Sequence, residues 1–73
     1  MMSSLRQYTI YDHPRDFPGG FVVREWEISA GGMASVRAWT APSLEAAREL
    51  IPEGLFCLQR DAADDPVIVE TWT

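Results

Sequence analysis

The sequence predicts an α+β fold in which one short helix packs on one face of an antiparallel sheet of four or five strands. Strand-like stretches with alternating side chains lie on both sides of a single helical stretch. The pair Gly31-Gly32 is typical of a tight hairpin turn. Of the 73 residues 47% are hydrophobic, enough for one core. We therefore expect a single domain over residues 1–73 in the order β-ββ-α-ββ, with residues 1–5 as a frayed terminus.

The first half of the chain predicts three strands. Residues 6–11 alternate, which places Tyr8 and Ile10 on one face. The next nine residues contain two prolines and two glycines and predict a loop. Residues 21–29 are rich in aromatic and β-branched side chains and give the strongest strand signal. One face of that strand would carry Val22, Arg24, Trp26 and Ile28. After the glycine pair, residues 34–40 form the expected return strand.

Ser43 is the expected N-cap of the helix, because its hydroxyl can accept a hydrogen bond from the first turn. The helix would run for eight or nine residues and end before Pro52. A helix of this length is unstable alone, so it must pack on the sheet. The residues expected in the resulting core are Leu44, Ala47, Ile51, Leu55 and Val69.

Two further strands are expected after the helix. Residues 55–59 form a compact apolar stretch, and residues 61–66 form a polar turn. Residues 67–72 alternate again, with Val67, Val69 and Thr71 opposite Ile68, Glu70 and Trp72. These two stretches predict a second hairpin.

The formal net charge is −5, and all six basic residues are arginine. The acidic excess lies in residues 41–73 and would repel nucleic acid and anionic membrane surfaces. A single cysteine, Cys57, excludes an intrachain disulfide, and residues 1–7 show no apolar run of the kind found in signal peptides. We therefore expect a cytoplasmic protein without nucleic-acid or membrane partners.

Three segments resemble short bacterial proteins to which no activity is assigned. They are YTIYDHPRDFPGGFVVREWEI at residues 8–28, SLEAAREL at residues 43–50 and DDPVIVETW at residues 64–72. The resemblance covers most of the chain. It implies a bacterial, cytosolic, single-domain protein and transfers no catalytic residue.

The first candidate site is the loop segment DHPRD at residues 12–16, which places the chain's only histidine, His13, between two carboxylates. Such a loop could form an acid–base centre. A strong metal site is disfavoured because no second histidine or cysteine lies nearby in sequence. A solvated loop in which Arg15 pairs with an acid is the expected arrangement. We expect His13 to be exposed and not to bind metal.

Two other features have simpler explanations than a site. The segment DAADD at residues 61–65 lacks the ligand spacing of a calcium-binding loop and is expected to be a charged turn. Cys57 is flanked by apolar residues and is far in sequence from His13, so we expect a small, buried core residue. No cofactor or metal site is predicted.

Aromatic and arginine side chains form the second candidate set. Tryptophan, tyrosine and arginine are enriched in binding hot spots, although several of these rings must also build the core. One helix covers only one face of such a sheet, so the second face must be exposed or covered by a partner. The set comprises Tyr8, Tyr11, Arg24, Trp26, Arg37, Trp39 and Trp72.

These features leave two functions open. The first is a small protein-interaction or regulatory binding module, homodimeric through the uncovered sheet face or an edge strand. The alternative is a small enzyme or ligand-binding protein that uses the His13 loop; of the two, binding is favoured over catalysis. A flat apolar face bearing tryptophan would favour the module, whereas a pocket converging on His13 with Arg15 or Arg24 would favour the alternative.

Overall fold

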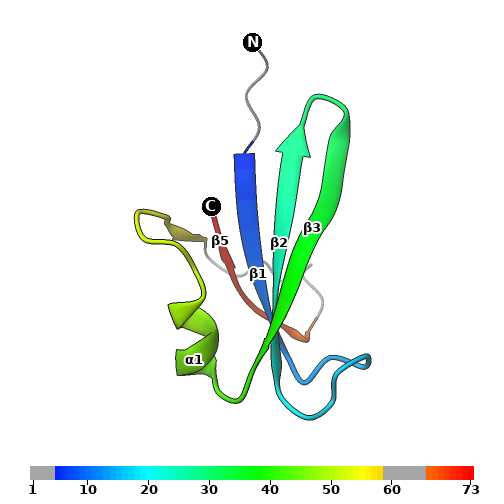
Figure 1. The fold of residues 1–73 in the computed structure, drawn as a ribbon, viewed down its shortest axis with the longest axis vertical. Helices are drawn as coiled ribbons and strands as arrows, with labels where there is room; N and C mark the ends of the chain where they lie inside the picture. Colours follow the sequence, from blue (N-terminus) through cyan, green and yellow to red (C-terminus); the bar gives the residue numbers. More distant parts are fainter. Residues whose placement is uncertain (1–4, 59–65) are drawn as a thin grey trace.

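The computed structural model describes residues 5–58 and 66–73, which form five strands and one short helix (Figure 1). All neighbouring strands are antiparallel, in the order β3-β2-β1-β5-β4. The predicted α+β fold is therefore confirmed. The elements are β1 (Leu5–Asp12), β2 (Phe21–Ser29), β3 (Gly32–Ala41), α1 (Leu44–Glu49), β4 (Cys57–Leu58) and β5 (Ile68–Trp72).

The alternation read from the sequence sets the two faces of the central strands. Ile10 of β1 pairs with Val23 of β2, and Val23 pairs with Trp39 of β3. These three side chains belong to the face that carries the helix, which we call the helix face. Tyr11 pairs with Val22 on the opposite side, which we call the second face. A one-residue slip would exchange the two faces, so the buried helix face specifies this register.

The helix begins where the sequence predicts but is shorter. The Ser43 hydroxyl accepts a hydrogen bond from the Ala46 backbone N–H at 3.1 Å. The helix has six residues and is capped by Leu50, whose N–H bonds to carbonyls of the last turn. It lies against β1, β2 and β3 and buries Ala47 completely. Its small size limits the area of sheet that it covers.

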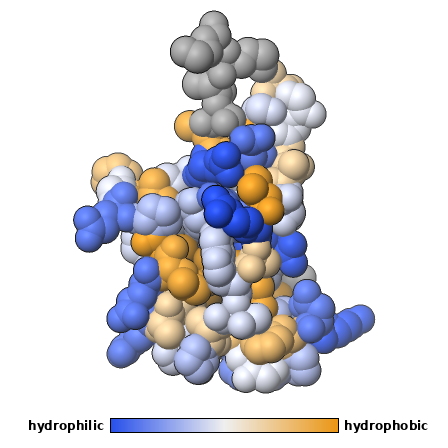
Figure 2. All heavy atoms as spheres, viewed as in Figure 1, coloured by the Kyte–Doolittle hydropathy of each residue, from blue (hydrophilic) through white to orange (hydrophobic). Residues whose placement is uncertain are grey.

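The core sits between the helix and the sheet. Ile10 and Val23 are its largest fully buried side chains. Of the residues expected in the core, Ala47 is buried, whereas the others are only half-buried against it: Leu44, Ile51, Leu55 and Val69. Figure 2 shows apolar residues gathered beside the helix and strongly hydrophilic residues above it, over β1 and β2. The six-residue helix covers only one end of the sheet. The four half-buried residues therefore lie at the edge of the core.

The C-terminal strands depart from the prediction in two ways. Among the described residues β4 contains two, Cys57 and Leu58, which pair with Trp72 and Thr71 of β5. As the edge of the sheet it is exposed, so the expectation that Cys57 is buried is wrong. In β5 the register shifts at Val69, so that Glu70 pairs with Ile10 whereas Ile68 pairs with Tyr11. Because of this irregularity, Ile68 and Glu70 pair with residues that point to opposite faces of β1. Simple alternation would place both on the same face.

The β2–β3 hairpin extends beyond the body of the domain (Figure 1). Its two-residue turn is Ala30-Gly31, and Gly32 follows with φ of 126°, which favours glycine. β3 is exposed from Gly32 to Ala38, because the helix lies against the other end of the hairpin. Within residues 5–58 and 66–73, β3 therefore forms a long exposed edge of the sheet.

In the part of the chain that the structure describes, α1 is far too short to cross a membrane, and no other helix qualifies.

Candidate functional site

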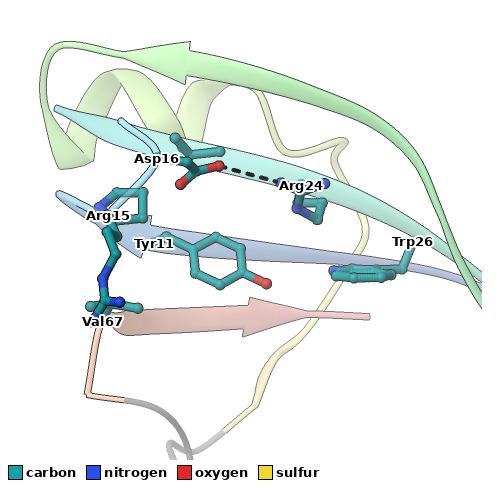
Figure 3. A pocket seen from close by; sticks show the side chains of 8 residues that line it. Tyr11, Arg15, Asp16, Arg24, Trp26 and Val67 are labelled. Atoms are coloured by element: carbon teal, nitrogen blue, oxygen red, sulfur yellow. Dashed lines mark ion pairs between the residues drawn. The ribbon is translucent and has the colours of Figure 1, made fainter. Parts of the chain in front are cut away.

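A cavity of about 400 Å³ lies on the second face, where the loop between β1 and β2 meets the sheet (Figure 3). Its apolar walls come from Pro14, Val22 and Val67. Its polar and aromatic walls come from Tyr11, Arg15, Asp16, Arg24 and Trp26. A mainly apolar pocket with a few converging polar groups is the usual form of a small-molecule site, and this volume is at the small end of the usual range.

The loop is held by backbone hydrogen bonds. The His13 N–H donates to the Gly20 carbonyl at 2.8 Å, and the Phe17 N–H donates to the Pro14 carbonyl at 3.0 Å. These bonds fold the loop so that Pro14 is buried. His13 has φ of 47°, a left-handed conformation that histidine adopts more readily than most residues. The left-handed backbone at His13 therefore helps to reverse the direction of the chain in this loop.

His13 is exposed, as predicted, and it does not line the cavity. Its Nδ1 contacts the Asp12 carboxylate, and its ring lies edge-on to Phe21, with the centroids 5.3 Å apart. The loop therefore contributes Arg15 and Asp16 to the cavity while the histidine stays outside. The alternative function predicted a pocket converging on His13 with Arg15 or Arg24, whereas the cavity is lined by both arginines but not by His13.

Arg24 is held in place by three neighbours. Its guanidinium donates to the Ser35 hydroxyl at 3.0 Å and lies 3.9 Å from the Asp16 carboxylate. It also lies over the Trp26 ring, 5.8 Å from the centroid. Asp16 therefore balances the charge of Arg24, and the stacked guanidinium orders one wall of the cavity.

Arg15 lies at the opposite end of the cavity from Trp26. Figure 3 shows its guanidinium beside Val67, with the Tyr11 ring between the two ends. Among residues 5–58 and 66–73 no carboxylate forms an ion pair with Arg15, which is exposed. With Arg24 balanced by Asp16, Arg15 supplies the net positive charge among the described residues that line the pocket.

The indole nitrogen of Trp26 is the least satisfied polar atom of the site. It is buried, and none of the described residues accepts a hydrogen bond from it. Figure 3 shows this edge of the indole turned toward Tyr11, whose hydroxyl points toward the same end of the cavity. A buried donor without a partner costs about 1–3 kcal/mol, so native proteins rarely keep one without a reason.

The structure divides the predicted aromatic and arginine set between the two faces. Tyr11, Arg24 and Trp26 of this set meet at the cavity on the second face, where Arg15 of the loop joins them. The other members lie on the helix face, where Arg37 stacks over the Trp39 ring at 5.7 Å and Trp72 packs against the core. The sequence could not show which tryptophan would line a pocket, because the covering loop is irregular.

A polar network on the helix face was not predicted. Glu25 is only 4% exposed, and its carboxylate accepts hydrogen bonds from the Tyr8 hydroxyl at 2.6 Å and from Arg37 Nε at 3.1 Å. Arg6 lies 3.6 Å from the same carboxylate. The signal in the sequence is an acid in the middle of the strongest strand, on the face of Val23.

The two buried groups of this network, Glu25 and Tyr8, have pKa values that are shifted further from neutral pH. The Tyr8 hydrogen bond lowers the pKa of Glu25 against the opposing effect of burial, and Arg37 lowers it further. Burial, followed by the hydrogen bond to Glu25, raises the pKa of Tyr8. Near pH 7 the carboxylate is therefore ionised and the phenol protonated. This arrangement stabilises the fold and does not resemble a general acid–base pair, whose pKa would lie near the working pH.

Acid should destabilise the protein partly through Glu25. Its pKa is lower in the folded chain than in the unfolded chain, where it is about 4.3, so the unfolded chain binds the proton first as the pH falls. The contribution of Glu25 to the free energy of unfolding is fully present above the pKa of the unfolded chain. It is lost as the pH falls through the pKa of the folded chain. Urea unfolding between pH 3 and pH 7 should show this loss, and Glu25→Gln should flatten it. Equal pH dependence in both proteins would contradict the assignment.

A second network ties the helix to β5. Arg48 donates from Nε to both Glu70 oxygens at 3.1 Å and also through Nη2, and the Trp72 indole donates to Glu70 at 3.1 Å. The Arg48 hydrogen bonds are the main reason that the pKa of Glu70 is lowered. Partial desolvation, followed by the charge of Glu70, raises the pKa of the Cys57 thiol. Cys57 is therefore a protonated thiol near neutral pH and a poor nucleophile.

Within the described ranges, no group of three or more histidine, cysteine or acidic side chains is arranged to hold a metal ion. The acidic segment at residues 61–65 lies outside the described residues. No family model, curated protein or solved structure matches the chain. The chemistry of the cavity is therefore the basis for a functional proposal.

Proposed function

We propose that this protein binds a small, flat organic molecule in the cavity on the second face. The observation that carries the proposal is the buried Trp26 N–H, for which no described residue supplies an acceptor, at the end of a pocket with apolar walls. A ligand oxygen within hydrogen-bond distance of this nitrogen would supply the missing acceptor. Binding is favoured over catalysis, because the groups that line the cavity include no histidine or cysteine.

The walls favour a flat ligand. The Tyr11 ring lies between the two ends of the cavity, and the Trp26 ring lies at one end beneath Arg24 (Figure 3). Aromatic rings gain most from contact with other flat surfaces, in offset or edge-on arrangements. The pocket is formed in large part without the ligand, because backbone hydrogen bonds fix the loop and Asp16 and Ser35 fix Arg24. Such pre-organisation reduces the cost of binding.

We expect para-coumarate, a flat molecule with a hydroxyl at one end and a carboxylate at the other, to bind in this cavity. In a titration followed by amide NMR shifts, the resonances of Tyr11, Arg24 and Val67 should move and saturate, while that of Ala47 on the helix face should not. Val67→Phe should fill the cavity and weaken binding at least about fivefold. Leu5→Phe adds the same ring at a position that is 65% exposed and should leave binding unchanged.

Either of two results would contradict the proposed function. One is the absence of saturable shifts at millimolar para-coumarate. The other is an equal affinity in Val67→Phe and the unmodified protein.

The second candidate function is self-association through the outer edge of β3. This strand has ten residues, and its exposed apolar side chains include Met33 and Val36, at 50% and 43% exposure. A long exposed edge is a template for pairing with another strand, and a second copy offers an identical one. The register shift opposite Glu25–Trp26 and the charge of Arg37 limit such pairing without removing the edge.

Light scattering at micromolar concentration should therefore give twice the monomer mass. Val36→Lys should restore the monomer, because charge on an edge strand opposes pairing. Phe56→Lys is the matched control: Phe56 is 78% exposed beside the opposite edge, and its replacement should leave the dimer intact. A monomer mass for the unmodified protein at high concentration would exclude this association.

We also infer a bacterial cytoplasmic location. The single cysteine suits a reducing compartment, and the absence of lysine and asparagine suits a GC-rich genome, because both use A-rich codons. The net charge of −5 argues against nucleic acid as a partner. Recovery of the protein in a membrane or periplasmic fraction would contradict this location.

A further inference from the structure

We infer that the ligand of the cavity is a monocarboxylate, and that Arg15 recognises its charge. This inference rests on the proposed function and adds the chemical class of the ligand. It follows from the charges that line the cavity: two arginines and one aspartate. Asp16 lies 3.9 Å from Arg24, and no carboxylate of residues 5–58 and 66–73 forms an ion pair with Arg15, so among the described residues the unbalanced charge of the site is that of Arg15.

The placement of the charges also orients the ligand. Arg15 lies beside Val67 at one end of the cavity, and the Trp26 N–H and the Tyr11 hydroxyl lie at the other (Figure 3). A carboxylate at the first end would receive charge-assisted hydrogen bonds from a planar guanidinium, which suits this group geometrically. The second end offers a neutral donor and a hydroxyl, which suit a neutral oxygen on the ligand.

A ligand with two negative charges fits less well. Its second charge would lie at the end where Arg24 is already balanced, with the Asp16 carboxylate close by. The whole chain also carries a net charge of −5, which repels additional anionic groups. The arrangement therefore favours one carboxylate and a neutral far end over a dicarboxylate or a doubly charged phosphate.

Three matched probes and one variant test this class. Para-coumarate carries one charge, para-coumaramide has the same shape without charge, and para-carboxycinnamate has a second carboxylate in place of the hydroxyl. In the unmodified protein, para-coumarate should bind about tenfold more tightly than either of the others. Arg15→Gln should reduce the preference for para-coumarate over para-coumaramide from about tenfold to less than about twofold. Saturable shifts of Tyr11 and Val67 with para-coumaramide show that the variant keeps the cavity.

The outcomes separate this inference from the proposed function. If para-coumaramide binds in the cavity as tightly as para-coumarate, or if Arg15→Gln affects both equally, the cavity is a binding site but the assignment of a monocarboxylate to Arg15 is wrong. Tighter binding of para-carboxycinnamate would likewise overturn the single-charge assignment. If none of the probes moves the amide resonances of Tyr11 and Val67, the proposed function fails and this inference fails with it.

Discussion

Ile10→Ala is expected to lower the free energy of unfolding by about 2–5 kcal/mol. Ile10 is fully buried at the centre of β1, between the strands that carry Val23 and Glu70 and beneath the helix. The substitution removes buried methyl and methylene groups and leaves a cavity that the surrounding strands cannot close. A domain of this length has a total stability of about 4–11 kcal/mol, so the substitution should remove a large fraction of it.

Leu5→Ala is the matched control for this experiment. Leu5 belongs to the same strand but is 65% exposed, so its truncation should change the stability by about 0.5 kcal/mol or less. Urea unfolding followed by circular dichroism measures both variants. Similar losses in the two proteins would show that the centre of the core has been misplaced.

Gly20→Ala is expected to cost about 1–3 kcal/mol and to weaken ligand binding. A methyl group at Gly20 would lie 2.8 Å from the Ala41 carbonyl oxygen and 3.3 Å from an atom of the Phe17 ring. The ring can move aside, but the carbonyl belongs to β3, where Ala41 pairs with Phe21. The loop must therefore shift, and the loop carries the Arg15 wall of the cavity.

Gly19→Ala separates this steric effect from the general cost of replacing glycine. A methyl group at Gly19 has no heavy atom within 4 Å outside the adjacent residues. Both substitutions restrict the unfolded chain to the same extent, so their difference reports the folded state. Gly19→Ala should stay within about 0.5 kcal/mol of the unmodified protein and bind para-coumarate normally. Equal effects of the two variants would contradict the packing described at Gly20.

The sequence predicted the parts of the fold that depend on local pattern. Alternation placed Tyr8 and Ile10 on one face, and Ser43 marked the start of the helix. The prediction failed where long-range pairing decides the structure. Cys57 lies in an apolar stretch, yet that stretch becomes the sheet edge and leaves the thiol residue exposed. The shift at Val69 likewise depends on the pairing of β5 with β1, which the alternation of one strand does not reveal.

The sequence analysis named some residues of the cavity but not their arrangement. Arg15 was named as part of the His13 loop and Arg24 and Trp26 by residue type, and all three line one cavity in the structure. His13 was the centre of the expected loop site, but it does not line the cavity, and its backbone turns at φ of 47°. A turn of this kind depends on the closing hydrogen bond to Gly20, seven residues later. No short sequence motif predicts this hydrogen bond between His13 and Gly20.

The indole N–H of Trp26 offers the most direct measurement of whether the cavity is a binding site. Its proton resonance is identified by its loss in Trp26→Phe, and the Trp72 indole, which already donates to Glu70, is the internal control. On addition of para-coumarate, the Trp26 resonance should move downfield and saturate as the N–H gains an acceptor, while that of Trp72 stays in place. A Trp26 resonance that does not move at millimolar ligand would contradict the account.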